Sequence, residues 1–200
     1  MFSLNLVFSF LLLVVGDGPA SVASATIDLS RSAAAGDPQA PVTIVEYACA
    51  RCPFCARLTP ELHDAVTTGP LKGKAKLYLR VFPLKNHSGA KEAAMAFEAA
   101  ADLDAFWPYV LFAFRHFEEF AIDKRADWAA KVGLDPQAFA ARLNDAKLVD
   151  RLVASKKEGL ANGVDGTPTL YINSRKYDGK NTLADIVRAA ESLAIASSPR

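Results

Sequence analysis

Three cysteines lie within seven residues of one another, and the chain has no others. Cys52 and Cys55 frame the segment Cys-Pro-Phe-Cys, and Cys49 lies three residues upstream. Two thiols separated by two residues at the start of a helix can close a small disulfide ring. A thiol at a helix N-terminus ionises more easily, because free N–H groups and the helix dipole stabilise its thiolate. The spacing therefore predicts thiol chemistry or metal binding.

The position of each thiol in the motif suggests a different reactivity. A thiol with a pKa of about 8.5 is only about 3% ionised at pH 7, whereas one with a pKa of about 6 is roughly 90% ionised. Stabilising the reduced thiolate also makes the disulfide a stronger oxidant. Cys52, at the helix N-terminus, is expected to be the reactive thiol. Cys55, one turn into the helix on its apolar side, is expected to be shielded and suited to resolving a mixed disulfide.

Strand and helix patterns surround the motif. The β-branched run at residues 42–47 predicts a buried strand. Pro53 opens a predicted helix to about Val66, since proline is tolerated at the first helical position. Residues 75–82 alternate with period two and predict a second strand. Strands joined by such a helix are expected to be parallel, with a right-handed crossover.

The rest of the chain predicts a helical insertion and a second half of the sheet. Residues 88–162 carry apolar side chains at helical spacing almost throughout. Strand character returns at 169–173, where Asn173-Ser174 predicts a hairpin turn, and a last helix is expected over 182–194. The predicted organisation is a linker-like arm at 26–41, a βαβ half at 42–87, the insertion at 88–162 and a ββα half at 163–196.

Residues 1–25 have the pattern of a signal peptide. The apolar run at 6–15 is too short to span a bilayer comfortably, and Ala23-Ser24-Ala25 fits a signal peptidase site. The first five residues lack Lys and Arg, so an uncleaved anchor is the alternative. Cleavage near Ala25 would place the protein in the periplasm or another extracytoplasmic compartment, where disulfides persist.

The overall composition excludes other classes of protein. The chain has 23 Lys and Arg residues against 22 Asp and Glu, so a strongly basic nucleic-acid-binding surface is not expected. Its 51% hydrophobic content is not that of a disordered chain. A chain of 200 residues can bury a sizeable core, so it does not need disulfides in order to fold.

Four segments together resemble the DsbA-like thiol-disulfide oxidoreductases of the thioredoxin superfamily. They are the strand and cysteine motif Val-Glu-Tyr-Ala-Cys-Ala-Arg-Cys-Pro-Phe-Cys at 45–55, Arg-Val-Phe-Pro-Leu at 80–84, Phe106-Trp107, and Gly-Val-Asp-Gly-Thr-Pro-Thr-Leu-Tyr-Ile-Asn at 163–173. The resemblance implies an α/β thioredoxin fold with a helical insertion between the second and third core strands. It also implies disulfide exchange with folding, cysteine-containing polypeptides, most of all as a dithiol oxidase.

The resemblance implies roles for individual residues. Cys52 is the surface nucleophile and Cys55 is the resolving thiol. Pro168 is the cis-proline that lies against the disulfide, and Thr167 before it leaves its backbone free to pair with an extended substrate peptide. Glu46 is the acid beneath the site that relays the proton of the resolving thiol. The alternative for Glu46 is an ordinary strand glutamate that faces solvent.

Two features depart from the family pattern. The dipeptide Pro53-Phe54, expected to contact substrate, has no histidine where the family's strongest oxidant has one, which argues for weaker oxidising power. Cys49 is an additional thiol with three interpretations: a small buried residue at the strand end, a thiol that competes in disulfide exchange, or a ligand in a C-x-x-C-x-x-C metal site. His63 or His87 would be the fourth ligand of that site; otherwise the histidines are expected at the surface or at helix caps.

The resemblance implies a monomer that needs neither cofactor nor metal, because the electrons reside in the sulfurs. A membrane-bound or soluble redox partner must then reset the couple. A reductase or isomerase for specific clients is an alternative, although residues 26–41 leave no room for the dimerisation domain of V-shaped isomerases. A non-catalytic thiol-based metal-binding or chaperone module is the other alternative.

Overall fold

The computed structural model describes residues 24–196, so nearly all of the predicted signal peptide lies outside the described residues. The elements are, in order, β1 (Ala35–Gly36), β2 (Val42–Ala48), α1 (Pro53–Thr67), β3 (Ala75–Val81), α2 (Ala90–Ala101), α3 (Phe106–Arg115), the 3₁₀ helix η1 (Phe117–Glu119), α4 (Arg125–Lys131), α5 (Pro136–Leu143), α6 (Ala146–Ala161), β4 (Thr169–Ile172), β5 (Arg175–Lys176) and α7 (Leu183–Ala196). Between residues 24 and 196, every helix is too short or too polar to cross a membrane.

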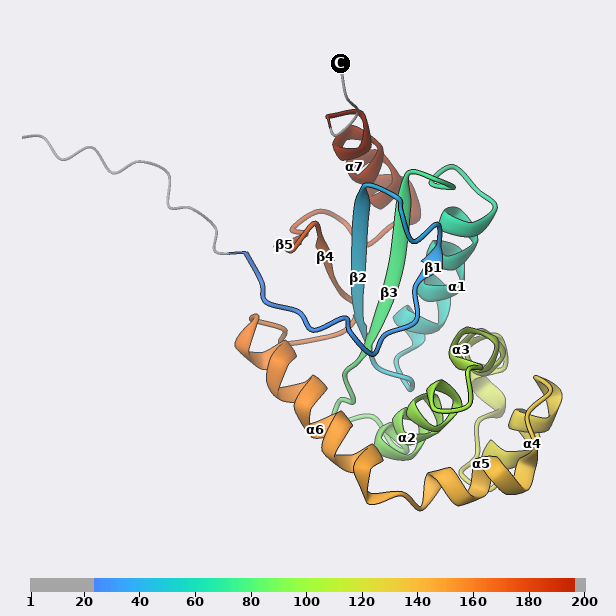
Figure 1. Cartoon of the computed structure of the whole chain (residues 1–200). Helices are drawn as coiled ribbons and strands as arrows, with labels where there is room; N and C mark the ends of the chain where they lie inside the picture. The colour runs from blue at the N-terminus through green and yellow to red at the C-terminus, as the bar shows by residue number, and fades with distance from the viewer. Residues whose placement is uncertain (1–23, 197–200) are drawn as a thin grey trace, which may run out of the picture.

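The strands form one sheet in the order β1-β3-β2-β4-β5 (Figure 1). The central strand β2 pairs in parallel with β3 and antiparallel with β4, and β5 continues the sheet as a hairpin with β4. Asn173 and Ser174 form the hairpin turn with positive φ angles of 49° and 65°, as a two-residue hairpin turn requires. The helices from α2 to α6 lie between β3 and β4 in sequence, so the predicted thioredoxin fold with a helical insertion is confirmed.

The arm before β2 contains a strand that the sequence analysis assigns to a linker. β1 pairs antiparallel with β3 at the edge of the sheet, with Ala35 opposite Leu77. Gly36 has a φ of +86°, and a Cβ there would lie 3.0 Å from the carbonyl oxygen of Val66. Only glycine fits this close approach easily. Two residues are too few to show a strand periodicity, which is why the pattern does not reveal β1.

Alternation along β2 divides its side chains between two layers. Ile44 and Ala48 face the core beneath α1 and α7, and Glu46 lies between them on the same face. Val45 and Tyr47 point to the opposite face, which the arm and the C-terminal half of α6 cover. The strand register therefore carries the Glu46 carboxyl underneath the helix that begins at the cysteine motif.

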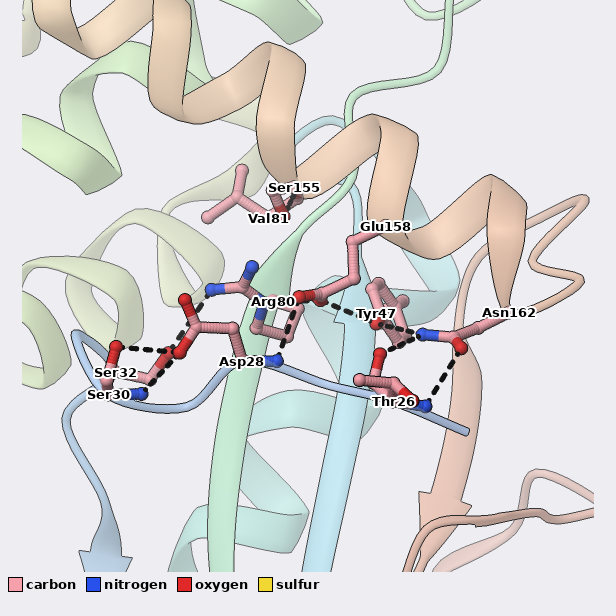
Figure 2. Close-up of polar contacts among 10 residues, drawn as sticks. All are labelled: Thr26, Asp28, Ser30, Ser32, Tyr47, Arg80, Val81, Ser155, Glu158 and Asn162. Atoms are coloured by element: carbon pink, nitrogen blue, oxygen red, sulfur yellow. Dashed lines mark hydrogen bonds and ion pairs between the residues drawn. The ribbon is translucent and has the colours of Figure 1, made fainter. Parts of the chain in front are cut away.

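Polar contacts fasten the arm across this second face (Figure 2). The Thr26 N–H donates to Oδ1 of Asn162 at 3.2 Å, and Nδ2 of Asn162 donates to the Thr26 carbonyl at 2.9 Å. The Asp28 N–H donates to Oε2 of Glu158 at 2.9 Å. The other oxygen of Glu158 accepts from Nε of Arg80 at 3.1 Å, so α6 joins the arm to β3.

Gly159 lets α6 pack closely on the aromatic side chains of this face. A Cβ at this position would lie 2.6 Å from Cε2 of Phe82 and 3.2 Å from Cε1 of Tyr47, and both rings are buried. We expect Gly159→Ala to lower the free energy of unfolding by about 1–3 kcal/mol, because overpacking outweighs alanine's better helix propensity. Urea denaturation should show this loss, whereas Leu160→Ala at the exposed next position should change stability little. Equal or greater stability of Gly159→Ala would contradict this packing.

Candidate active site

The cysteine motif begins α1 directly after the carboxyl end of β2. Cys52 is the N-cap residue of α1 with an extended backbone, and Pro53 opens the helix. Proline has no backbone N–H, but an N–H at the first helical position would have no partner within the helix, so α1 loses no hydrogen bond. The N–H groups of Phe54 and Cys55 stabilise the Cys52 sulfur as a thiolate. The structure thus has the helix N-terminus that the spacing predicts.

Hydrogen bonds lower the pKa of Cys52 from 9.0 to about 5. The largest contribution comes from the Cys55 thiol, and burial opposes it. Thr167 and the two backbone N–H groups of α1 add to the lowering. Cys52 is therefore a thiolate at neutral pH, which is the form that attacks disulfides.

The structure corrects the expectation of a surface nucleophile. Cys52 is only 2% exposed, because a loop distant in sequence covers its sulfur. Sγ of Cys52 lies 3.4 Å from the carbonyl oxygen of Thr167, to which the protonated thiol donates. The side chains exposed at this point are those of Pro53 and Phe54, and Phe54 is 60% exposed.

The covering loop leads from α6 into β4, and its Thr167–Pro168 peptide bond is cis. Nδ2 of Asn181 donates to the Pro168 carbonyl at 3.0 Å, and the Thr169 hydroxyl donates to the Gly166 carbonyl at 2.8 Å. The Thr167 hydroxyl is buried in this loop, and it lowers the pKa of Cys52. The structure thus brings Thr167 and Pro168 beside the cysteine motif, as the resemblance implies.

Cys55 and Glu46 are both completely buried beneath the motif. Burial raises the pKa of Cys55 well above 9.0, and the hydrogen bond to Cys52 and the charge of Glu46 add to this effect. Burial also raises the pKa of Glu46 from 4.5 to about 8. The alternative of a solvent-facing Glu46 is therefore wrong. At neutral pH its carboxyl is mostly protonated and able to donate a proton.

Thr59 is a neighbour of Glu46 that the sequence analysis does not identify. Its hydroxyl lies 2.9 Å from each carboxyl oxygen and is itself buried. A signal was present, because Thr59 follows Cys55 by four residues and so shares its face of the helix. This hydrogen bond lowers the pKa of Glu46 and partly opposes the effect of burial.

We expect Thr59→Val to raise the pKa of Glu46 further, because the isosteric side chain removes the hydroxyl and keeps the site dry. Infrared difference titration of the buried carboxyl would measure this shift. Thr68→Val on the exposed end of the helix removes a comparable hydroxyl and is the matched control. An unchanged or lower pKa of Glu46 in Thr59→Val would show that the hydroxyl does not act on this carboxyl.

Cys49 is buried at the end of β2, and its Sγ lies 3.4 Å from Nδ1 of His87. His63, the other candidate fourth ligand, packs against Trp107 with a ring-centroid distance of 5.1 Å. Within residues 24–196, no three His, Cys, Asp or Glu side chains are grouped so that they could hold a metal ion. The interpretation of the three cysteines as metal ligands therefore gains no support from the arrangement of the described side chains.

Arg51 fixes the turn before Cys52 onto the helical insertion, a role that sequence reasoning missed. Its guanidinium lies 4.5 Å from the ring centroid of Phe117 and 4.7 Å from that of Phe120. It also donates to the Phe117 carbonyl at 2.7 Å. Contacts between a cation and two aromatic rings restrain the side chain, so the insertion helps to hold the cysteine motif in place.

Comparisons with known proteins agree with this architecture. A family model described as Thioredoxin matches residues 29–192. BdbD from Bacillus subtilis in its oxidised form superposes with a TM-score of 0.73 at 19% identity, covering 87% of this chain and 98% of BdbD. The thiol-disulfide exchange protein alpha-DsbA2 from Wolbachia pipientis has a TM-score of 0.72 at 22% identity, covering 83% of this chain and 88% of that one.

A curated sequence relative is the Na(+)/H(+) antiporter NhaA 1 of Mycolicibacterium gilvum (strain PYR-GCK). It is 32% identical over 169 residues, which are 82% of this chain but 27% of the antiporter. The chain therefore spans about a quarter of the length of the curated relatives it matches. The family model, by contrast, covers most of this chain. On that match, the chain belongs to the thioredoxin family.

Proposed function

We propose that the protein exchanges disulfides with cysteine-containing polypeptides through Cys52 and Cys55, most readily as a dithiol oxidase. The observation that carries this proposal is the contrast between the two thiols. The pKa of Cys52 is lowered to about 5, whereas that of Cys55 is raised far above neutrality by burial. One sulfur is prepared to attack or to leave, and the other is kept as a protonated internal thiol.

In the proposed oxidation the protein begins with a Cys52–Cys55 disulfide. A client thiolate attacks Sγ of Cys52, and the Cys55 sulfur leaves and takes up a proton from the carboxyl of Glu46. A second client thiolate then attacks the client sulfur of the mixed disulfide, and Cys52 leaves as a thiolate. The client loses two electrons and gains a disulfide, while the protein becomes a dithiol. The low pKa of Cys52 makes it a good leaving group in the second step.

The direction of exchange follows from the stability of the reduced form. Each hydrogen bond that stabilises the Cys52 thiolate also stabilises the dithiol and so makes the disulfide more oxidising. These bonds come from Cys55, Thr167 and the start of α1. The dipeptide Pro53-Phe54 contributes no charged side chain, so we propose an oxidase weaker than one with a histidine at this point.

The proposed substrate site combines a backbone edge with an apolar contact. An extended client segment would pair with the backbone before Pro168, in the manner of an added strand. Phe54 is exposed beside it and offers a hydrophobic surface to the residues flanking the client cysteine. Such contacts recognise a backbone and an apolar side chain rather than one sequence, which suits unfolded or folding polypeptides.

We propose that this exchange takes place outside the cytoplasm. The predicted signal peptide at residues 1–25 supports export, and an oxidising compartment is where disulfides persist. A membrane-bound or soluble partner would reoxidise the dithiol, and the protein would act as a monomer without a cofactor. Neither nucleic acid nor metal has a part in the proposed reaction.

A variant with Cys52 as its only thiol tests the proposal. In Cys49→Ser/Cys55→Ser, an internal thiol is no longer present to displace a bound client, so mixed disulfides should accumulate when Cys52 attacks a polypeptide that carries disulfides. They should disappear on treatment with dithiothreitol and map to Cys52 by mass spectrometry. The matched variant Cys49→Ser/Cys52→Ser keeps only Cys55, whose raised pKa leaves it protonated, and should form almost none. Equal trapping by both variants would refute Cys52 as the nucleophile.

A further inference from the structure

Cys52 has a second buried thiol at the same sequence spacing on its other side. The Cys52 N–H donates to the carbonyl oxygen of Cys49 at 3.0 Å and closes a turn over residues 49–52. The Cα atoms at the ends of such a turn lie within about 7 Å of each other, a separation that a disulfide can bridge. Cys49 and Cys55 are each completely buried, so burial does not disqualify Cys49 from a reaction inside the protein.

The Cys49 thiol also has its own proton acceptor. Nδ1 of His87 lies 3.4 Å from its sulfur, and a neutral imidazole protonated at Nε2 would accept the thiol proton at this atom. His87 lines a groove of about 500 Å³ at the surface, through which the proton can pass to solvent. On the other side of the motif, the acid that acts on Cys55 is Glu46.

A fixed cation favours the ionised form of Cys49. Nζ of Lys156 donates to the Pro83 carbonyl at 3.1 Å and lies 3.3 Å from the ring centroid of Phe82. Its charge lowers the pKa of Cys49, although burial is the larger effect and raises it overall. The Cys52 charge acts on Cys49 as well, which shows that the two sulfurs are electrostatically coupled.

From this geometry we propose that Cys49 is a second resolving thiol, which attacks Cys52 and forms a Cys49–Cys52 disulfide. The proposal rests on the proposed function, since it needs a disulfide at Cys52. Cys49 gives its proton to His87, and its sulfur attacks Sγ of Cys52. The bond between Cys52 and the client sulfur breaks, and the client leaves as a thiolate that is protonated by solvent. The Cys52–client disulfide is exchanged for a Cys49–Cys52 disulfide, so the number of disulfides is unchanged and the step requires no further oxidant.

The same attack on a Cys52–Cys55 disulfide moves the bond without changing the oxidation state. The Cys55 sulfur leaves and takes its proton from the carboxyl of Glu46, while the proton of Cys49 goes to His87. Cys52 thus has two internal partners, each beside its own group for proton transfer: Glu46 for Cys55 and His87 for Cys49. A client held in a mixed disulfide with Cys52 can therefore be released in two ways: by attack of Cys55, which lies in α1, or by attack of Cys49, which begins the turn at residues 49–52.

Ellman's reagent separates these routes in a variant that lacks Cys55. In Cys55→Ser, Cys52 releases one equivalent of thionitrobenzoate when it is modified, and attack by Cys49 should release a second. Cys49→Ser/Cys55→Ser should stop after one equivalent and keep the adduct on Cys52. His87→Gln in the Cys55→Ser background should slow the second release more than the first, whereas His63→Gln should slow neither selectively.

Tryptic mapping identifies the bond directly, because Arg51 separates the two sulfurs. A Cys49–Cys52 disulfide in Cys55→Ser joins peptide 32–51 to peptide 52–57, and reduction separates them. If Cys55→Ser instead keeps its Cys52 adduct as long as the double variant does, the inference about Cys49 is wrong and the proposed function stands. If neither variant forms an adduct at Cys52, the proposed function itself fails.

Discussion

Cys52→Ser is expected to reduce disulfide exchange to the uncatalysed rate. Cys52 is the thiol whose pKa is lowered, to about 5, whereas burial raises the pKa of both Cys49 and Cys55. A serine hydroxyl at the same position can neither attack a disulfide at neutral pH nor carry one. The rate at which the oxidised protein forms disulfides in a reduced, unfolded polypeptide measures this loss.

The result depends on the variant keeping its fold. Serine is close in size to cysteine, so the unfolding midpoint in urea and the circular dichroism spectrum should remain near those of the parent protein. With the fold intact, substantial exchange by Cys52→Ser would mean that another thiol starts the reaction. The assignment of Cys52 as nucleophile would then have to be given up.

Glu46→Gln is expected to stabilise the protein by several kcal/mol at pH 8 and to change its stability little at pH 4. Burial raises the pKa of Glu46 from 4.5 to about 8. The folded state therefore binds the proton more tightly than the unfolded state does. The contribution of Glu46 to the free energy of unfolding of the wild type is fully present below about pH 4.5. Between about pH 4.5 and pH 8 it declines by about 1.4 kcal/mol per pH unit.

Glutamine removes this titration and keeps a carbonyl oxygen that accepts from Thr59. Urea denaturation of both proteins at pH 4, 6 and 8 should show a difference in the free energy of unfolding that widens with pH. Glu119→Gln is the control, because Glu119 is exposed and the hydrogen bond to His116 lowers its pKa. A difference between Glu46→Gln and wild type that does not vary with pH would contradict the burial of an ionisable carboxyl. Because the amide cannot relay a proton, Glu46→Gln should also slow the departure of Cys55 during exchange.

The fold is largely predictable because its main elements have strong local patterns. The β-branched run at 42–47 and the alternating run at 75–82 correspond to β2 and β3, and the helix predicted from Pro53 corresponds to α1. The breaks between α2 and α6 and the two-residue strand β1 are not evident in the sequence. Contacts such as the Asn162 amide with the Thr26 backbone join residues more than a hundred positions apart. Such contacts leave no periodicity from which they could be inferred.

In the candidate site, too, features set by neighbouring residues are predictable, and features set by residues distant in sequence are not. The spacing of Cys52 and Cys55 predicts a helix N-terminus, and strand alternation places Glu46 on the buried face with Ile44. The near-complete burial of Cys52 follows from a loop 115 residues away that reaches over it through Thr167. The sequence could not indicate that coverage, because it depends on how α6 returns the chain to the sheet.

Equilibration of the protein with glutathione buffers of graded redox potential tests the central claim most directly. Free thiols are alkylated at each potential, and tryptic peptides are mapped by mass. We expect one two-electron transition in which Cys52 is part of every disulfide formed. Its main partner should be Cys55, as a bond within peptide 52–57, at a potential above that of the glutathione couple. If Cys52 stays fully alkylatable in oxidising buffer, or if the disulfide excludes Cys52, then Cys52 is not the redox-active thiol of this protein.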